Sequence, residues 1–225
     1  MTRTFFVTGT DTEIGKTAMS CALLEAAAAA GLSTAGLKPV AAGCDADGRN
    51  EDALALMASM TAELSYEDVN PVALQEAIAP HIAADHEGRR LDADYLAGLC
   101  REPMAGGHDL LLIEGAGGWR VPLNARETLA DVAVQLQVPV ILVVGMRLGC
   151  INHALLTAEA VAGDGLTLAG WIANQCGPRM DCHEQNLDTL RALMPAPCLG
   201  DVPWLTPFSA AKAANYIELP ALKGK

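Results

Sequence analysis

The chain has 225 residues, of which 51% are hydrophobic, and a formal net charge of −12 with an isoelectric point of about 4.7. This length and composition predict one compact domain, residues 1–225, with a large core. The acidic balance excludes a global basic field that would attract nucleic acid or an anionic membrane. The longest apolar run, 138–145, is too short to cross a bilayer, and the first residues lead directly into a strand, so we expect a cytoplasmic protein with reduced cysteines.

The stretch 7–17 has the order of a phosphate-binding loop. An apolar strand leads into a polar loop, and Gly-Lys-Thr at 15–17 opens an alanine-rich helix. In such a loop Lys16 reaches the outer phosphates and the Thr17 hydroxyl binds Mg²⁺. The spacing is imperfect, because Thr10 stands where the usual pattern has glycine. A plain strand-to-helix turn is the alternative, but the flanking strand and helix favour the phosphate loop.

The first half of the chain alternates strands and helices around this loop. In order, the sequence predicts a helix over 17–30, a strand over 33–40 that Pro39 ends, a loop over 41–50 and a helix over 51–60. From 61 to 88 short helical stretches mix with turn residues, and no firm element is predicted there.

The second half continues the alternation. It predicts a helix over 91–104 capped by Asp92, a buried strand over 109–114, a glycine-rich loop over 115–119, a helix over 129–136, a strand over 138–145, a helix over 150–162, a strand over 168–174, a helix over 182–194 and a strand over 198–202. This alternation predicts an α/β fold like that of P-loop NTPases, with a doubly wound, mostly parallel sheet of about seven strands flanked by helices.

Polar side chains follow four of these strands, at the edge where functional groups of parallel sheets gather. They are Lys16 with Thr17, then Lys38, Glu114 and Asn174. Two lysines suit a transferring phosphoryl group, whose charge spreads over several oxygens. Thr17 with two carboxylates, Glu114 and Asp52, suits Mg²⁺. The residues alone therefore indicate an enzyme or switch that uses Mg·ATP or Mg·GTP.

Each of these side chains also has an ordinary interpretation. Asp52 lies in the first turn of a helix, where an acid favours the dipole. Glu114 could be a solvated loop acid, and Lys38 an ordinary charge at a strand end. The five histidines and seven cysteines show no metal-ligand spacing, so no zinc site is predicted.

Several segments together resemble the dethiobiotin synthetase family. They occur in the family's order and cover nearly the whole chain: 9–17, 36–40, 50–54, 70–71, 114–119, 139–152, 168–174 and 200–205. The resemblance implies a homodimer that makes dethiobiotin from 7,8-diaminononanoate, CO2 and ATP. In that family a carbamate forms, ATP phosphorylates it, and the second amine closes the ring and releases phosphate.

The resemblance also implies roles for individual residues. Catalysis would fall to Lys16 and Lys38, and Thr17, Asp52 and Glu114 would hold Mg²⁺. The nucleotide would contact Glu13, Ile14, Gly15, Lys16, Thr17, Ala18, Asp52, Glu114, Gly115, Ala116, Gly117, Asn174, Gln175, Pro203, Trp204 and Leu205. The diamine would contact Thr12, Lys38, Ala42, Gly117 and Gly118, with Gly149, Cys150, Ile151 and Asn152 of the other subunit receiving its carboxylate at a helix start.

One position departs from the family pattern, and two alternatives stay open. Ala42 stands where the family usually has a hydroxyl residue that contacts the substrate, so we expect weaker substrate binding with intact chemistry. A related amidoligase acting on another acid is one alternative, although the chain has no room for the usual glutaminase domain. A partner-regulated ATPase of the MinD or ParA kind is the other. Asp11 stands where those proteins carry their signature lysine, which counts against it.

Overall fold

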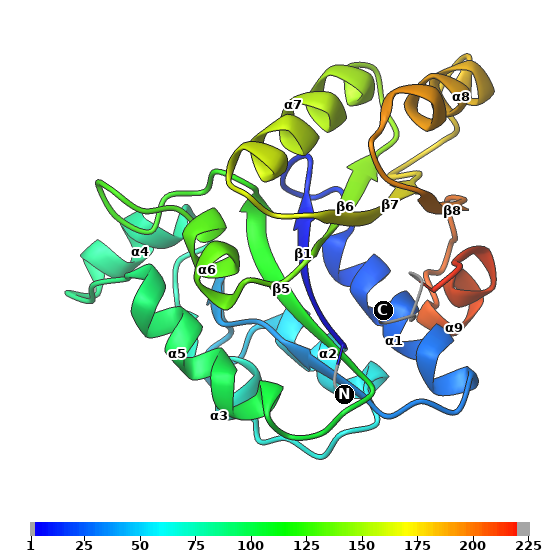
Figure 1. Ribbon diagram of the computed structural model, residues 1–225. Helices are drawn as coiled ribbons and strands as arrows, with labels where there is room; N and C mark the ends of the chain where they lie inside the picture. The colour runs from blue at the N-terminus through cyan, green and yellow to red at the C-terminus, as the bar shows by residue number, and fades with distance from the viewer. Residues whose placement is uncertain (1–2, 220–225) are drawn as a thin grey trace.

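The computed structural model describes residues 3–219, and a six-stranded parallel sheet lies at the centre of this part of the chain (Figure 1). The strand order is β2-β5-β1-β6-β7-β8, with every neighbouring pair parallel. The strands are β1 (Arg3–Gly9), β2 (Thr34–Leu37), β5 (Leu110–Gly118), β6 (Val140–Gly145), β7 (Leu168–Asn174) and β8 (Cys198–Val202). The chain order reverses around β1, so the crevice beside its carboxyl end is where ligands bind in such sheets.

A second, two-stranded parallel sheet stands beside the first. It pairs β3 (Val40–Ala42) with β4 (Val72–Leu74). The predicted strand over 33–40 is therefore two shorter strands, because Pro39 has no N–H group for a continuous ladder. The loop predicted over 41–50 is wrong at its start, where residues 41 and 42 belong to β3.

Helices cover both faces of the main sheet, as the doubly wound prediction requires. One face carries α1 (Lys16–Ala29), α2 (Glu51–Ser59), α9 (Ala210–Ala213) and the 3-10 turn η1 (Ala214–Tyr216). The opposite face carries α5 (Ala93–Met104), α6 (Leu129–Leu136), α7 (Cys150–Gly163) and α8 (His183–Leu193). In β5, Leu110 and Leu112 join the core under α1, while Leu111 and Ile113 join the core on the other face. This two-sided burial explains the continuous apolar run in that strand.

The glycine-rich segment 115–119, predicted as a loop, is mostly a continuation of β5. The strand runs through Gly118, which pairs with Gly9 of β1. A Cβ at Gly115 would lie 3.1 Å from Phe6 Cε1, so the absence of a side chain lets the two strands approach. Glycine here supports close strand packing, and it does not end the strand.

Three elements lie in the region 61–88, where the sequence predicts no firm structure. They are α3 (Tyr66–Val69), β4 and α4 (Pro80–His86). Each is too short for hydrophobic periodicity to reveal it. The predicted Asp92 cap of α5 is confirmed, since its side chain accepts a hydrogen bond from the Tyr95 N–H. α9 and η1 were not predicted.

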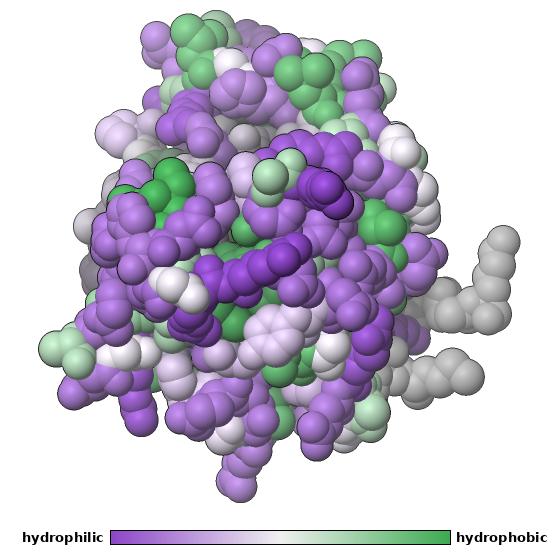
Figure 2. All heavy atoms as spheres, turned by 90° about the vertical axis from the view of Figure 1, so that its left-hand side faces the viewer, coloured by the Kyte–Doolittle hydropathy of each residue, from purple (hydrophilic) through white to green (hydrophobic). Residues whose placement is uncertain are grey.

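The surface that carries α4 and α5 is mostly hydrophilic, with hydrophobic residues in small separate patches (Figure 2). Within residues 3–219, no helix combines the length and the apolar character that crossing a bilayer requires.

Candidate active site

The loop between β1 and α1 is held in a shape that fits an anion. Gly15 caps α1 with a φ of +81°, and a Cβ there would lie 2.3 Å from Asn174 Nδ2, so only glycine fits. Asn174 donates a hydrogen bond of 2.8 Å to the carbonyl of Ile14. The helix start therefore directs its free N–H groups toward the crevice, as phosphate binding requires.

The two departures from the usual loop pattern have structural partners on the β6 side. Thr10 Oγ1 accepts a hydrogen bond of 3.3 Å from the Gly145 N–H. Asp11 forms an ion pair with Arg147. These contacts anchor the first half of the loop to the end of β6.

Lys16 is nearly buried, with 7% of its surface exposed. Its ammonium donates to the Asp11 carbonyl at 3.1 Å. Burial, together with the nearby Lys38 ammonium, lowers the pKa of Lys16 to about 8. The site therefore holds two positive charges close together and away from water, which is energetically unfavourable. A bound anion would offset this unfavourable free energy.

A charged cluster joins the end of β2, the middle of β5 and the start of α2. Lys38 Nζ lies 2.6 Å from Glu114 Oε1 and 2.9 Å from Asp52 Oδ2. Burial alone would lower the pKa of Lys38, but the two carboxylates outweigh it and raise that pKa. Burial alone would likewise raise the pKa of Asp52, but the Lys38 ammonium lowers it below its ordinary value. The cluster thus favours a charged lysine between charged carboxylates.

The same cluster has the donor set of a site for a hard cation. Thr17 Oγ1 donates to Glu114 Oε1 at 2.7 Å, so a hydroxyl and two carboxylates converge on one place. Glu114 is completely buried, and its second oxygen, Oε2, has no hydrogen-bond partner. A buried carboxylate oxygen without a partner is costly in the protein alone. The residues therefore fit Mg²⁺, which takes oxygen ligands beside phosphates.

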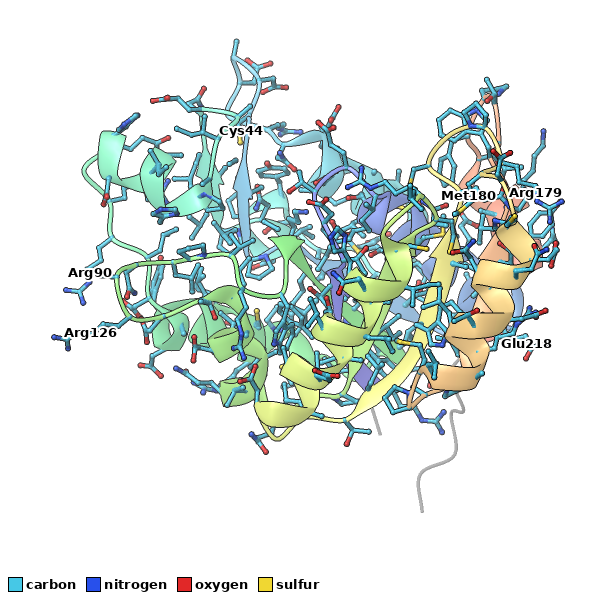
Figure 3. All side chains as sticks on the ribbon, turned by 90° about the horizontal axis from the view of Figure 1, so that it is seen from above. Cys44, Arg90, Arg126, Arg179, Met180 and Glu218 are labelled. Atoms are coloured by element: carbon cyan, nitrogen blue, oxygen red, sulfur yellow. The ribbon has the colours of Figure 1, made fainter. Side chains whose placement is uncertain are left out.

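A cleft of about 790 Å³ opens over this cluster on the carboxyl edge of the sheet, the edge that Figure 3 views from above. It brings together predicted residues from four segments: Thr12, Glu13, Gly15, Lys16, Thr17, Lys38, Ala42, Asp52, Ala116 and Gly117. Further lining residues were not predicted: Ala41, Asn50, Glu51, Ala77, Ile78, Ala79, Pro80, Val121 and Pro122. Ala41 comes from β3 and residues 77–79 from the segment before α4, whose placement no motif revealed.

A second hollow of about 420 Å³ lies on the other side of the phosphate loop and shares Glu13 and Gly15 with the cleft. It contains six residues predicted to contact the nucleotide: Ala18, Asn174, Gln175, Pro203, Trp204 and Leu205. Cys176 and residues 206–208 also line it and were not predicted. Its apolar walls and the exposed Trp204 ring offer a stacking surface for a planar base.

The remaining predicted residues lie outside both hollows. Ile14 is buried in the core, Gly115 offers its carbonyl to Lys38 at 3.3 Å, and Gly118 lies against Gly9. The four residues predicted to act from a partner subunit, 149–152, open α7, with Gly149 as its cap. They line neither hollow of their own subunit.

The comparisons with known proteins decide the family. An ATP-dependent dethiobiotin synthetase from Cellvibrio japonicus is 57% identical over 98% of this chain and 97% of its own length. One from Pseudomonas paraeruginosa is 56% identical over 97% of both chains. The chain belongs to the dethiobiotin synthetase family. In agreement with this assignment, a protein-family model described as an AAA domain matches residues 3–212 of this synthetase family member.

Solved structures agree on the fold. MinD from Pyrococcus horikoshii, in complex with Mg-ADP, superimposes with a TM-score of 0.57 over 98% of this chain and 88% of its own, at 16% identity. At that identity the likeness concerns the fold alone. Membership of the dethiobiotin synthetase family therefore favours the synthetase over the MinD-type alternative.

Proposed function

We propose that this chain is an ATP- and Mg²⁺-dependent cyclo-ligase that converts 7,8-diaminononanoate and CO2 to dethiobiotin, with release of ADP and phosphate. The observation that carries the proposal is the convergence of Lys16 and Lys38 with Thr17, Asp52 and Glu114 at one edge of the sheet. The resemblance of the chain to curated dethiobiotin synthetases supplies the reaction.

The proposed reaction has three steps. One amine of the substrate attacks CO2 and loses a proton, which gives a carbamate. A carbamate oxygen then attacks the γ-phosphorus of ATP, forming a carbamic–phosphoric anhydride and releasing ADP. Finally the second amine attacks the carbamoyl carbon and loses a proton, and phosphate leaves with the C–O bond electrons as the ureido ring closes. Phosphorylation turns a poor leaving group into a good one.

The two lysines have separate tasks in this scheme. Lys16, at the start of α1, holds the β- and γ-phosphates together with the loop N–H groups. Lys38 reaches the cleft from β2 and stabilises the carbamate and the transferring phosphoryl group. Its contact with Glu114 and Asp52 keeps it protonated in the absence of substrate.

Thr17, Asp52 and Glu114 would hold Mg²⁺. The ion neutralises charge on the phosphate oxygens when it is bound. The partnerless Oε2 of Glu114 supports this assignment, since a cation would satisfy it. The base would occupy the hollow bordered by Asn174 and Trp204, and the nucleotide would cross the loop at Gly15, which lines both hollows.

The diamine would occupy the cleft beside Thr12, Ala42 and Gly117, and a homodimer would complete the site. Residues 149–152 open a helix of 14 residues, whose N-terminus suits the substrate carboxylate of the partner's site. The Leu148 side chain directly before it is 94% exposed. An exposed leucine at this place supports its burial in a subunit interface.

The direct test is a coupled assay of ADP release with diaminononanoate, bicarbonate and Mg·ATP, with dethiobiotin identified by mass spectrometry. Lys38→Ala and Lys16→Ala should abolish turnover. Lys212→Ala, on the exposed side of α9, is the matched control and should keep wild-type rates. Absence of diamine-dependent ADP release by the wild-type protein would refute the proposal.

A further inference from the structure

The backbone of Lys38 is fixed by the last residue of α3 and the residue that follows it. Its N–H donates to the Val69 carbonyl at 2.7 Å, and its carbonyl accepts a hydrogen bond of 2.6 Å from Asn70 Nδ2. Asn70 is only 3% exposed, so this amide lies in the interior. The direction in which the Lys38 side chain enters the cleft therefore depends on how the Asn70 amide is oriented.

A second asparagine fixes the start of the helix that carries Asp52. The Asn50 side-chain oxygen accepts hydrogen bonds from the N–H groups of Asp52 and Ala53, at 3.1 and 3.4 Å. Its Nδ2 donates to the carbonyls of Ala42 and Gly43, at 3.3 and 3.2 Å. Asn50 thus ties one carboxylate of the charged cluster to the end of β3.

The Tyr66 hydroxyl joins these two asparagines. It accepts a hydrogen bond of 2.7 Å from the Asn50 N–H and donates one of 2.9 Å to Asn70 Oδ1. Burial raises the pKa of Tyr66, so the hydroxyl keeps the proton that it donates. The Arg49 guanidinium lies 5.3 Å from the ring centroid and holds the ring from its face.

We infer that Tyr66, Asn50 and Asn70 form a polar relay that positions Lys38 relative to Asp52, with Tyr66 as its central positioning residue. This inference rests on the proposed function for its catalytic meaning. An asparagine amide has a donor end and an acceptor end. Asn70 can present its NH₂ to Lys38 only if a donor meets its oxygen, and the Tyr66 hydroxyl is that donor. Without the Tyr66 hydroxyl, the buried Asn70 oxygen has no donor, and only the contacts of Nδ2 with the carbonyls of Lys38 and, at 3.5 Å, Val72 hold the amide.

The decisive variant is Tyr66→Phe, which keeps the ring and removes only the hydroxyl. We expect kcat to fall roughly tenfold, because a small displacement of Lys38 weakens stabilisation of the transferring group. The KM for ATP should change less than about twofold, since the phosphate loop and base hollow are untouched. Tyr95→Phe is the matched control, because Tyr95 is 51% exposed and makes no recorded hydrogen bond through its hydroxyl within residues 3–219.

A stability control separates positioning from general loosening. Thr61→Val removes the hydrogen bond of 2.8 Å from the Thr34 N–H to Thr61 Oγ1, which lies at the opposite end of β2. If Thr61→Val lowers the denaturation midpoint as much as Tyr66→Phe but leaves kcat unchanged, positioning is supported. An equal loss of kcat in both variants would overturn the relay.

A double-variant cycle tests whether the relay acts as a unit. Tyr66→Phe combined with Asn70→Ser should reduce kcat no further than Asn70→Ser alone, because both changes break the same chain of bonds. Effects that multiply independently would overturn the inference.

Hydrogen exchange gives a readout that needs no turnover and no Asn70 variant. Tyr66→Phe should speed exchange at the Asn50 N–H and across 36–42 by at least about tenfold, while Thr61→Val should not change exchange at Asn50. Unchanged exchange in Tyr66→Phe would overturn the relay. Failure of the proposed function would give a different result: the wild-type protein would show no diamine-dependent turnover.

Discussion

Lys38 Nζ and Glu114 Oε1 lie 2.6 Å apart where the end of β2 meets the middle of β5, in a part of the protein from which water is almost completely excluded. The Lys38 ammonium neutralises a Glu114 carboxylate that has no contact with solvent. The same carboxylate is the proposed ligand of Mg²⁺. The Lys38 ammonium and a bound Mg²⁺ would therefore both neutralise the Glu114 carboxylate, so loss of one cation should change the effect of the other on stability.

The first prediction concerns this charge balance. Lys38→Met leaves Glu114 as a buried negative charge without a cation, beside the half-buried Asp52, so we expect the free energy of unfolding to fall by about 3–5 kcal/mol. Millimolar Mg²⁺ should restore a larger part of that loss in the variant than it adds to the wild-type protein. Urea denaturation with and without MgCl₂ measures both effects, and Lys212→Met serves as the control. Identical responses to Mg²⁺ in Lys38→Met and wild type would contradict the prediction.

The second prediction concerns pH and Lys16, whose folded-state pKa of about 8 lies below the ordinary value of 10.5. Between these two values the unfolded chain binds more protons than the folded one, so this group makes stability rise with pH from about 8 to 10.5. Below pH 8 both states are protonated, and the cost of burying the charge is constant at about 3 kcal/mol. Lys16→Met should therefore gain most over the wild type below pH 8, and the difference should shrink toward pH 10. Urea denaturation at pH 7, 8, 9 and 10, without nucleotide or metal, measures it; a difference independent of pH would argue against a buried, titrating Lys16.

The third prediction concerns Gly117, which has a φ of +65° and lies in the cleft. A Cβ there would lie 2.7 Å from Val121 Cγ2, so Gly117→Ala should lower the free energy of unfolding by about 1–3 kcal/mol. It should also raise the KM for the diamine, because Val121 must move within the cleft. Gly163→Ala, where an added Cβ meets nothing within 4 Å, is the matched control. Equal stability and KM in the two variants would count against this account.

The fourth prediction concerns Ala42, at the end of β3 on the wall of the cleft. Ala42→Ser supplies the hydroxyl that the family usually has there, and one hydrogen bond is worth about 0.5–1.5 kcal/mol. The KM for diaminononanoate should therefore fall several-fold with little change in kcat. Steady-state kinetics with varied diamine measures this, beside Ala62→Ser as a control outside the cleft. No change in KM would remove the explanation.

The sequence predicts the chemistry at each strand end better than it predicts which strands are neighbours. Glu114 is recognisable because an apolar run ends in a carboxylate, and Lys16 because a helix follows it. Their meeting with Lys38 depends on β2 lying beside β5, and that pairing joins residues far apart in the chain. Local sequence patterns carry no information about such a pairing, so the contact between Lys38 and Glu114 could be identified only from the three-dimensional structure.

The misread segments have a common physical cause. Tyr66 lies on a helix of four residues, which offers too few positions for a hydrophobic period. Residues 115–118 contain three glycines, which are rare in strands, yet here they permit close packing against Phe6 and Gly9. In both places tertiary contacts override local preference.

The position of β1 in the sheet has a consequence for how the protein is made. β1 leaves the ribosome before the other strands, but its hydrogen-bond partners are β5 and β6, which end at Gly118 and Gly145. Until those strands emerge, the phosphate loop has neither Gly145 to hold Thr10 nor Glu114 to meet Thr17. A nascent chain that stops short of β5 therefore exposes an apolar strand with two open edges, a form prone to aggregation and to capture by chaperones. Synthesis must pass the middle of the chain before its first strand has a stable place.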